Sequence, residues 1–223
     1  MFINQLELHS SNLEAQSDYY LNALELPVKL SSDSLKVQAG ATTLIFKQAQ
    51  SGFDGAYHFA FNIPENQIRG AKEWIASRVP LLRDETGKDD FDSDNWNSHS
   101  VYFKDAAGNV LEFIARRNLK NAVEGEFNSG QILNVSEIGL PSEDVIAFAK
   151  NLCSTLGLSV FKQEPGETFT PVGDDNGLFI LPVKSRIWYP NTGVPAKLLP
   201  VKVKGTANGK DWEVRGVPYE IIR

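Results

Sequence analysis

A histidine and a glutamate interrupt two otherwise apolar, strand-like segments, and both are residue types that bind divalent metal ions. His58 begins a segment in which Phe59 and Phe61 fall on the opposite face. Glu112 lies within an apolar segment that follows the turn sequence at 105–109. A carboxylate inside a sheet is costly to desolvate unless a metal ion, a basic partner or water compensates. His58 and Glu112 are therefore predicted to form part of a metal site with nitrogen and oxygen ligands; a hydrogen-bonded pair in a metal-free fold is the alternative.

The composition limits the classes of function and of partner. The chain has 223 residues, of which 42% are hydrophobic, enough for one large or two smaller compact units. A net charge of −6 argues against nucleic acid and anionic membranes as partners. The only cysteine, Cys153, excludes an intrachain disulfide, suits a reducing compartment and is expected to be a small buried residue. With neither a secretory leader nor an apolar run of about 20 residues, a cytoplasmic protein is expected.

Three segments of the chain begin alike, with a strand, a polar turn and then a helix. Asn12 and Ser142 are the predicted N-caps of the first and third helices, and Gly157 is predicted to end the third. Short strands are predicted after these helices at 35–39, 42–47, 100–104, 109–115, 158–162, 168–172 and 178–183. The strand–helix–strands pattern is an internal repeat and predicts an α+β fold.

Two polar stretches are predicted to lie outside the strands and helices of these units. Residues 121–130 are predicted to be a linker, and residues 87–97 an exposed loop that can overhang a site. The predicted division is a two-module domain at 1–120 and a third module with a C-terminal extension at 131–223. The open sheet edges of the third module would need a partner. The tail at 200–223 can supply strands for this purpose, and a homodimer is the competing solution.

Three stretches carry a resemblance to a known family: the segment from Asn12 to Leu26, the phrase His58-Phe59-Ala60-Phe61, and the run from Tyr102 to Glu112. They resemble the vicinal-oxygen-chelate superfamily, which includes glyoxalase I, bleomycin-resistance proteins, fosfomycin-resistance proteins and extradiol dioxygenases. The resemblance covers residues 1–117 and, less closely, 131–183. It implies paired βαβββ modules that form a cupped mixed sheet, here with a third related module.

In that family the metal ligands lie on the first and fourth strands of each module. The resemblance places Gln5 and the apolar Ile45 at these positions in the first module, and His58 and Glu112 in the second. It thus implies a metal site of Gln5, His58 and Glu112. The third module has Glu137 and Ile180 near the corresponding positions, but no evident partner module, and is expected to carry no metal.

Two further residues are candidates for acid–base chemistry. Tyr102 precedes Glu112 by ten residues, a spacing that resembles that of an acid–base tyrosine in extradiol dioxygenases. His9 shares a strand face with Gln5 and can serve as an acid–base group or a substitute ligand, although a solvated turn histidine is the simpler interpretation. His99 is expected to lie on the surface.

The resemblance implies a metal-dependent enzyme that acts on a small oxygen-bearing molecule, as a lyase, a dioxygenase or a transferase. Its divalent ion, which can be Fe, Mn, Zn or Ni, would act as a Lewis acid on neighbouring oxygens of the substrate. The alternative is a metal-free protein that sequesters a small molecule, as bleomycin-resistance proteins do. The fold alone does not fix the chemistry.

Overall fold

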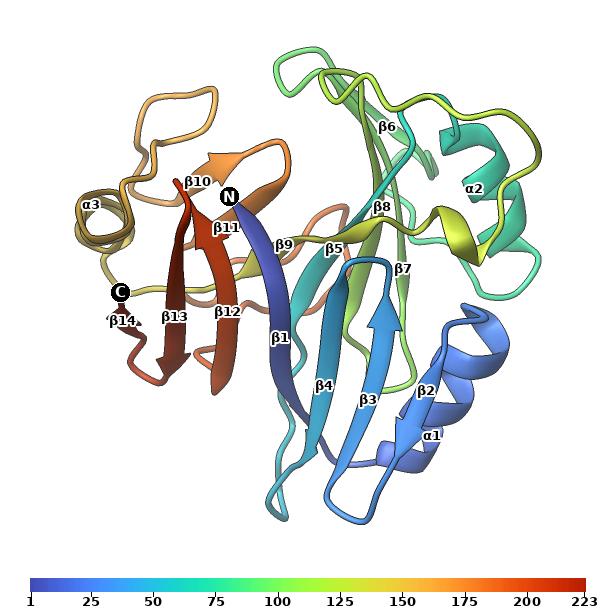
Figure 1. The fold of residues 1–223 in the computed structure, drawn as a ribbon, viewed down its shortest axis with the longest axis horizontal. Coiled ribbons are helices and arrows are strands. Elements are labelled where there is room, and N and C mark those ends of the chain that lie inside the picture. The colour runs from blue at the N-terminus through green and yellow to red at the C-terminus, as the bar shows by residue number, and fades with distance from the viewer.

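The computed structural model describes residues 1–223 and contains two seven-stranded mixed sheets (Figure 1). Sheet A has the order β14-β13-β12-β1-β4-β3-β2, and sheet B has the order β10-β11-β9-β5-β8-β7-β6. The strands of sheet A are β1 (Phe2–Ser10), β2 (Val28–Leu30), β3 (Ser34–Ala39), β4 (Thr42–Gln48), β12 (Val201–Ala207), β13 (Lys210–Gly216) and β14 (Glu220–Ile222). The strands of sheet B are β5 (His58–Ile63), β6 (Phe91–Ser93), β7 (Ser98–Lys104), β8 (Val110–Arg116), β9 (Asn134–Gly139), β10 (Phe169–Asp174) and β11 (Gly177–Pro182).

A helix follows the first strand of each module, as the repeat predicts. The helices are α1 (Leu13–Asp18), continued by a π-helical turn η1 (Tyr19–Ala23), then α2 (Ile68–Ala76), a short 3₁₀ turn η2 (Ser129–Gln131) and α3 (Val145–Leu156). The first module is therefore β1-α1-β2-β3-β4, the second is β5-α2-β6-β7-β8, and the third is β9-α3-β10-β11. The predicted α+β class is confirmed, with βαβββ modules in the first two units. The strand predicted at 158–162 does not form, because only Val160 makes an isolated bridge there, so the third module has two strands after its helix. No helix is long and apolar enough to cross a membrane.

Local sequence signals explain where two of the helices begin and end. The Asn12 side chain accepts a hydrogen bond from the backbone N–H of Ala15, 2.9 Å away, and caps α1 as predicted. The N-cap of α3 is Asp144, not Ser142, because the Asp144 carboxylate reaches the N–H of Ala147. Gly157 ends α3 in the left-handed conformation, with φ of 67°, which glycine adopts without steric cost.

The modules pair differently from the sequence-based expectation. The first two modules were expected to share one cupped sheet, but β5 pairs antiparallel with β9, so sheet B joins the second module to the third. β1 pairs antiparallel with β12, so sheet A joins the first module to the C-terminal strands. In Figure 1 the strands β12, β1, β4 and β3 run side by side across the front. Each central strand thereby obtains a hydrogen-bonded neighbour on both sides, and neither β1 nor β5 is left as an open edge.

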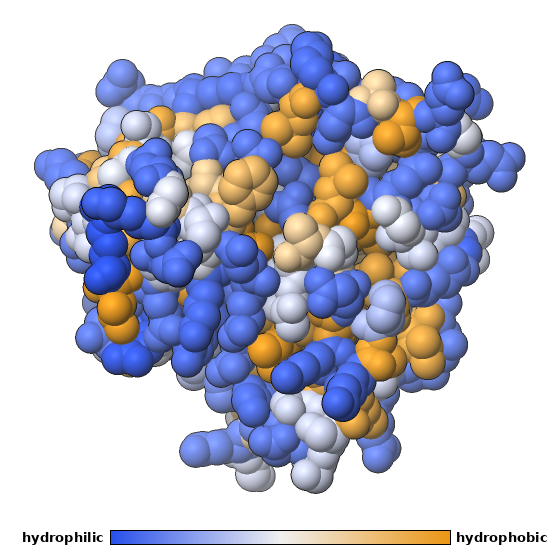
Figure 2. Space-filling view, viewed as in Figure 1, coloured by the Kyte–Doolittle hydropathy of each residue, from blue (hydrophilic) through white to orange (hydrophobic).

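The two faces of sheet B have different environments. Phe59, Phe61 and Phe113 lie in the main hydrophobic core, which also contains residues of sheet A such as Leu6 and Leu8. A smaller apolar cluster includes Val110 and Ile180 of sheet B and Trp188 from the segment after β11. Val110 and Ile180 alternate along their strands with residues of the main core, so they lie on the opposite face. Hydrophilic side chains cover most of the molecular face shown in Figure 2, with smaller apolar areas among them.

A buried aspartate ties the first module to the second. Asp105, in the turn between β7 and β8, accepts hydrogen bonds from Gln16 at 2.8 Å and from the hydroxyl of Tyr20 at 3.1 Å. It also accepts from the side-chain amide of Asn109 at 2.8 Å. A buried carboxylate with several donors is stable only while those donors are in place, so this contact fixes the helical segment of the first module against sheet B.

Candidate metal centre and its cavity

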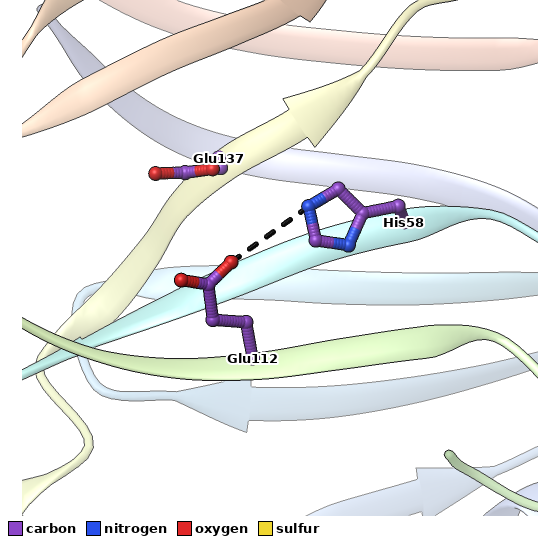
Figure 3. Close-up of side chains that lie close together, drawn as sticks. All are labelled: His58, Glu112 and Glu137. Carbon is purple, nitrogen blue, oxygen red and sulfur yellow. Dashed lines mark ion pairs between the residues drawn. The ribbon is translucent and has the colours of Figure 1, made fainter. Parts of the chain in front are cut away.

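Three adjacent strands of sheet B bring His58, Glu112 and Glu137 together (Figure 3). His58 comes from β5, Glu112 from β8 and Glu137 from β9, and all three side chains are buried. The Nε2 atom of His58 lies 3.8 Å from Oε2 of Glu112. One potential ligand atom from each residue lies within 4.8 Å of the other two. Strand alternation therefore predicted correctly that His58 and Glu112 lie together, and the structure adds Glu137.

The register of the three strands explains this convergence. Ala60 on β5 is opposite Glu112 on β8 and also opposite Glu137 on β9. Residues directly opposite each other on neighbouring strands project from the same face, so both carboxylates extend over Ala60. The pairing of β5 with β9 shifts next to this point and leaves Ser136 as the extra residue of a bulge. The small Ala60 side chain leaves space in which the two carboxylates meet.

His58 is already oriented as a metal-ligating histidine would be. Its Nδ1 atom lies 3.0 Å from the carbonyl oxygen of Val110. Donation of a proton to that carbonyl fixes the tautomer in which Nε2 carries the free lone pair toward Glu112. The ring packs against Trp188 at a centroid distance of 5.0 Å. Burial lowers the pKa of His58 to about 4, against the opposing effect of the Val110 hydrogen bond, so the ring is neutral near pH 7.

The two carboxyl groups are strongly perturbed by burial. Burial, followed by the charge of Glu137, raises the pKa of Glu112 to about 8; Ser100, the charge of Arg116 and Tyr102 act in the opposite direction. Burial likewise raises the pKa of Glu137, against the effect of Arg116. Two carboxyl groups in one buried site favour the binding of a cation between them, because a cation offsets both the desolvation and the mutual repulsion.

A buried arginine supports this arrangement from one side. The Arg116 side chain has no exposed surface and forms an ion pair with Oε1 of Glu137. Its Nε–H also donates to Oδ1 of Asn62 at 3.2 Å. Because the guanidinium engages one oxygen of Glu137, the other oxygen remains for a different partner. Outer partners of this kind orient the ligands in metal sites.

The donor set fits a divalent transition-metal ion. One imidazole nitrogen and two carboxylate oxygens are ligands that zinc, manganese and iron accept. Two ligand atoms of one ion lie at most about 4.4 Å apart, since the bonds are about 2.0–2.2 Å long. Side-chain shifts of up to about an ångström would bring the three donors, which lie within 4.8 Å of one another, into bonding range. Ile180 lines the same cavity and contributes no donor.

The three candidate ligands lie in a cavity of about 370 Å³. The stretch at 87–97, predicted as an exposed loop, contains the strand β6 with the buried Phe91, and it contributes part of the cavity wall, including Phe91 and Trp96. Tyr102 lines the cavity and is opposite Glu112 in the pairing of β7 with β8. Burial, and then the charge of Glu112, raise the pKa of Tyr102 well above its usual value, so the phenol keeps its proton.

Two predicted site residues lie elsewhere. Gln5 is on β1 of sheet A, paired with Thr43 and Lys204, and does not line the cavity. His9 lies near the end of β1, where its ring is 6.3 Å from that of Phe53, and it is also absent from the cavity. Both expectations are corrected for one physical reason: β1 pairs with β12 and not with β5, so its residues belong to the other sheet.

Glu137, and not Gln5, lies beside His58 and Glu112. It occupies a first-strand position in the third module, as the resemblance indicated, but that module was expected to lack a partner and to carry no metal. Its partner is the second module, through β5 and β9. The position of Glu137 was therefore recognisable in the sequence. Its place beside His58 was missed because the first module, and not the third, was expected to pair with the second. His99 lies outside the cavity and contacts Asp90 at 3.1 Å.

Comparisons with known proteins place this geometry in a structural context. No protein-family model matches the chain, and neither does any curated protein. Among solved structures, a "putative dioxygenase" from Bacillus subtilis subsp. subtilis str. 168 is similar with a TM-score of 0.63 and 15% identity, over 96% of this chain and 81% of the other. A point mutant of glyoxalase I from Zea mays is similar with a TM-score of 0.51 and 14% identity, over 82% of this chain and 67% of the other. The chain has the fold of the vicinal-oxygen-chelate superfamily.

Proposed function

We propose that this protein is a divalent-metal-dependent enzyme of the glyoxalase and dioxygenase type, acting on a small oxygen-bearing molecule in the cavity of sheet B. The observation that carries the proposal is the convergence of His58, Glu112 and Glu137 in one buried site. A metal ion held there would act as a Lewis acid toward substrate oxygens. Lyase, dioxygenase and transferase chemistry are all compatible with such an ion.

The surrounding residues supply what such a reaction needs from the protein. Tyr102 carries a protonated phenol beside Glu112, so it can donate a hydrogen bond or a proton to an oxygen of the bound molecule. Arg116 holds one oxygen of Glu137 and so fixes the direction of its other oxygen. Aromatic side chains line part of the cavity, and a bound molecule that displaces water from them would strengthen electrostatic interactions there.

Metal content is the direct test of this proposal. The protein would be purified without chelator, and its bound transition metals measured by mass spectrometry alongside a His58→Ala variant. About one equivalent of a divalent ion is expected in the unaltered protein and almost none in the variant. His99→Ala is the matched control, because His99 lies outside the cavity and should leave the metal content unchanged. Equal metal content in the His58→Ala variant would contradict the proposal.

A metal-free binding protein is the second candidate, and the protonation of the site favours it. With a pKa of about 8, Glu112 is mostly neutral at pH 7, and Glu137 is already paired with Arg116. The cavity can therefore exist without an ion and without an unpaired buried charge. If this candidate is right, the protein binds small molecules equally well with and without added Mn²⁺, Fe²⁺ or Zn²⁺.

A further inference from the structure

We infer that the ligand of this cavity is a small aromatic anion and that Arg186 binds its charged group. The inference rests on the proposed function in taking the cavity of sheet B as the substrate site, and its charge balance counts the divalent ion proposed there. Three features carry it: aromatic side chains on the walls, an arginine at the cavity without an acidic partner, and the balance of charges around it.

Aromatic side chains form a substantial part of the cavity walls. Phe91, Tyr102 and Tyr189 form one group, with centroid distances of 4.9–5.6 Å and edge-to-face geometry between all three pairs. Trp96 and Phe169 form a second group at 6.4 Å, with ring planes inclined by 31°. All five residues line the same cavity. Such rings offer faces and edges that favour a planar, unsaturated guest over a saturated one of equal size.

Arg186 lines this cavity and is held in place without being neutralised. One of its guanidinium nitrogens donates to the carbonyl oxygen of Thr168 at 3.2 Å. Its central carbon lies 4.8 Å from the ring centroid of Phe169, in a cation–π contact. Arg186 forms no ion pair with any carboxylate of the chain. Its remaining N–H donors are suited to the planar geometry of a carboxylate.

The other charges of the cavity do not cancel that of Arg186. Asp92 also lines the cavity, but it is paired with Arg117. A divalent ion would balance the two carboxylates of Glu112 and Glu137. Arg116 does not line the cavity and also lies 3.8 Å from Asp175, so Arg186 would then leave an excess of positive charge around the bound molecule. This excess favours an anion, although the chain as a whole has a net charge of −6.

The cavity is large enough for such a guest. Its volume of about 370 Å³ lies in the lower part of the range of about 300–1,000 Å³ found for small-molecule pockets. This size suits a molecule of one or two rings. Ile187 and Tyr189 line the cavity while remaining 47% and 54% exposed, so the guest reaches the cavity past side chains that also face solvent.

The test is a calorimetric titration of the full chain with three probes of matched shape: 2-naphthoate, the neutral 2-naphthol and the saturated decahydro-2-naphthoate. We expect 2-naphthoate to bind about tenfold more tightly than either analogue, as a charge-assisted hydrogen bond and aromatic contacts allow. Arg186→Gln should remove about tenfold of the 2-naphthoate affinity and change that of 2-naphthol less than about twofold. Arg69→Gln is the matched control, because Arg69 is exposed and outside the cavity.

The inference is overturned if 2-naphthoate binds no better than its analogues, or if Arg186→Gln weakens the acid and the neutral probe equally. Arg186→Lys keeps the charge, and thermal unfolding of each variant shows whether the fold is intact. The titrations are run on metal-free protein and again with Zn²⁺. Arg186-dependent binding of 2-naphthoate without any metal binding would support this inference and contradict the proposed metal function. Metal binding without any preference for 2-naphthoate would support the proposed metal function and contradict this inference.

Discussion

His58, Glu112 and Glu137 are held in different ways before any ion binds. His58 is fixed by its hydrogen bond to the Val110 carbonyl, and Glu137 by its ion pair with Arg116. Glu112 has no such fixed charged partner, and its pKa of about 8 means that it holds a proton at neutral pH. At the scale of single residues, Glu112 is therefore the group whose protonation should govern metal binding.

Metal affinity is expected to increase with pH up to about 8 and then to level off. In the metal-free protein Glu112 holds a proton below pH 8, and this proton must leave when an ion binds. Each pH unit below 8 should therefore cost about tenfold in affinity, and the raised pKa of Glu137 acts in the same direction. His58, with a pKa of about 4, adds no dependence above pH 6. Calorimetric titrations with Zn²⁺ at pH 6, 7 and 8 would check this, and a constant affinity over that range would be the contrary result.

The buried pair of Arg116 and Glu137 should matter for stability mainly when only one partner is removed. Arg116→Met is expected to lower the free energy of unfolding by about 3–5 kcal/mol, because Glu137 loses its counter-charge in a buried site. The double variant with Glu137→Leu should recover much of that loss, since neither charge remains. Urea denaturation would measure both. Arg69→Met, in an exposed pair with Glu73, is the control and should cost less than about 1 kcal/mol. A double variant as unstable as Arg116→Met would disprove this account.

At the scale of secondary-structure elements, local patterns predicted most strands and helices. Alternation placed His58 and Glu112 on the face opposite Phe59 and Phe61, and Asn12 marked the start of α1. The predicted N-cap of α3, Ser142, lies two residues before the observed one, Asp144, because both residues offer a side-chain oxygen near that point. The bulge in β9 had no local signal, since it depends on how that strand pairs with β5.

Ala60 offers a test of the register between these strands. It lies opposite both carboxylates, so Ala60→Val should occupy the space in which they meet and weaken Zn²⁺ binding at least about tenfold. Valine suits a strand, so the fold should remain intact. Ala60→Gly at the same position leaves that space open and should keep the metal affinity, at a cost of roughly 1 kcal/mol in stability. Equal Zn²⁺ affinity in the valine and glycine variants would argue against this placement of the site.

At the scale of the whole molecule, the repeat predicted the modules but not their partners. Local sequence determines where a strand forms, whereas the choice of its neighbour depends on which apolar faces pack together after the chain has folded back. Here the third module covers the edge of β5 and the C-terminal strands cover the edge of β1. The candidate site depends on this choice, because Glu137 reaches His58 only through the pairing of β5 with β9.

Removal of residues 131–223 is therefore expected to leave a poorly soluble remnant. Both β1 and β5 would lose a hydrogen-bonded neighbour, and apolar residues of the core such as Phe59 would lose contacts with Ile138. The remnant should also bind no metal, because Glu137 is lost. Size-exclusion chromatography and circular dichroism of a 1–130 fragment would provide the check. A soluble, folded monomer would show that the third module is not needed to complete the sheets.

The most direct test of the central claim compares Zn²⁺ binding in the unaltered protein with that in Glu137→Gln and Gln5→His variants by calorimetry. We predict one ion per chain, and an affinity loss in Glu137→Gln of about 100-fold or more, since even outer partners of metal ligands contribute about 10–100-fold. Gln5→His should change nothing, because Gln5 belongs to sheet A. Tighter binding in Gln5→His, or unchanged binding in Glu137→Gln, would contradict a metal centre built from the second and third modules.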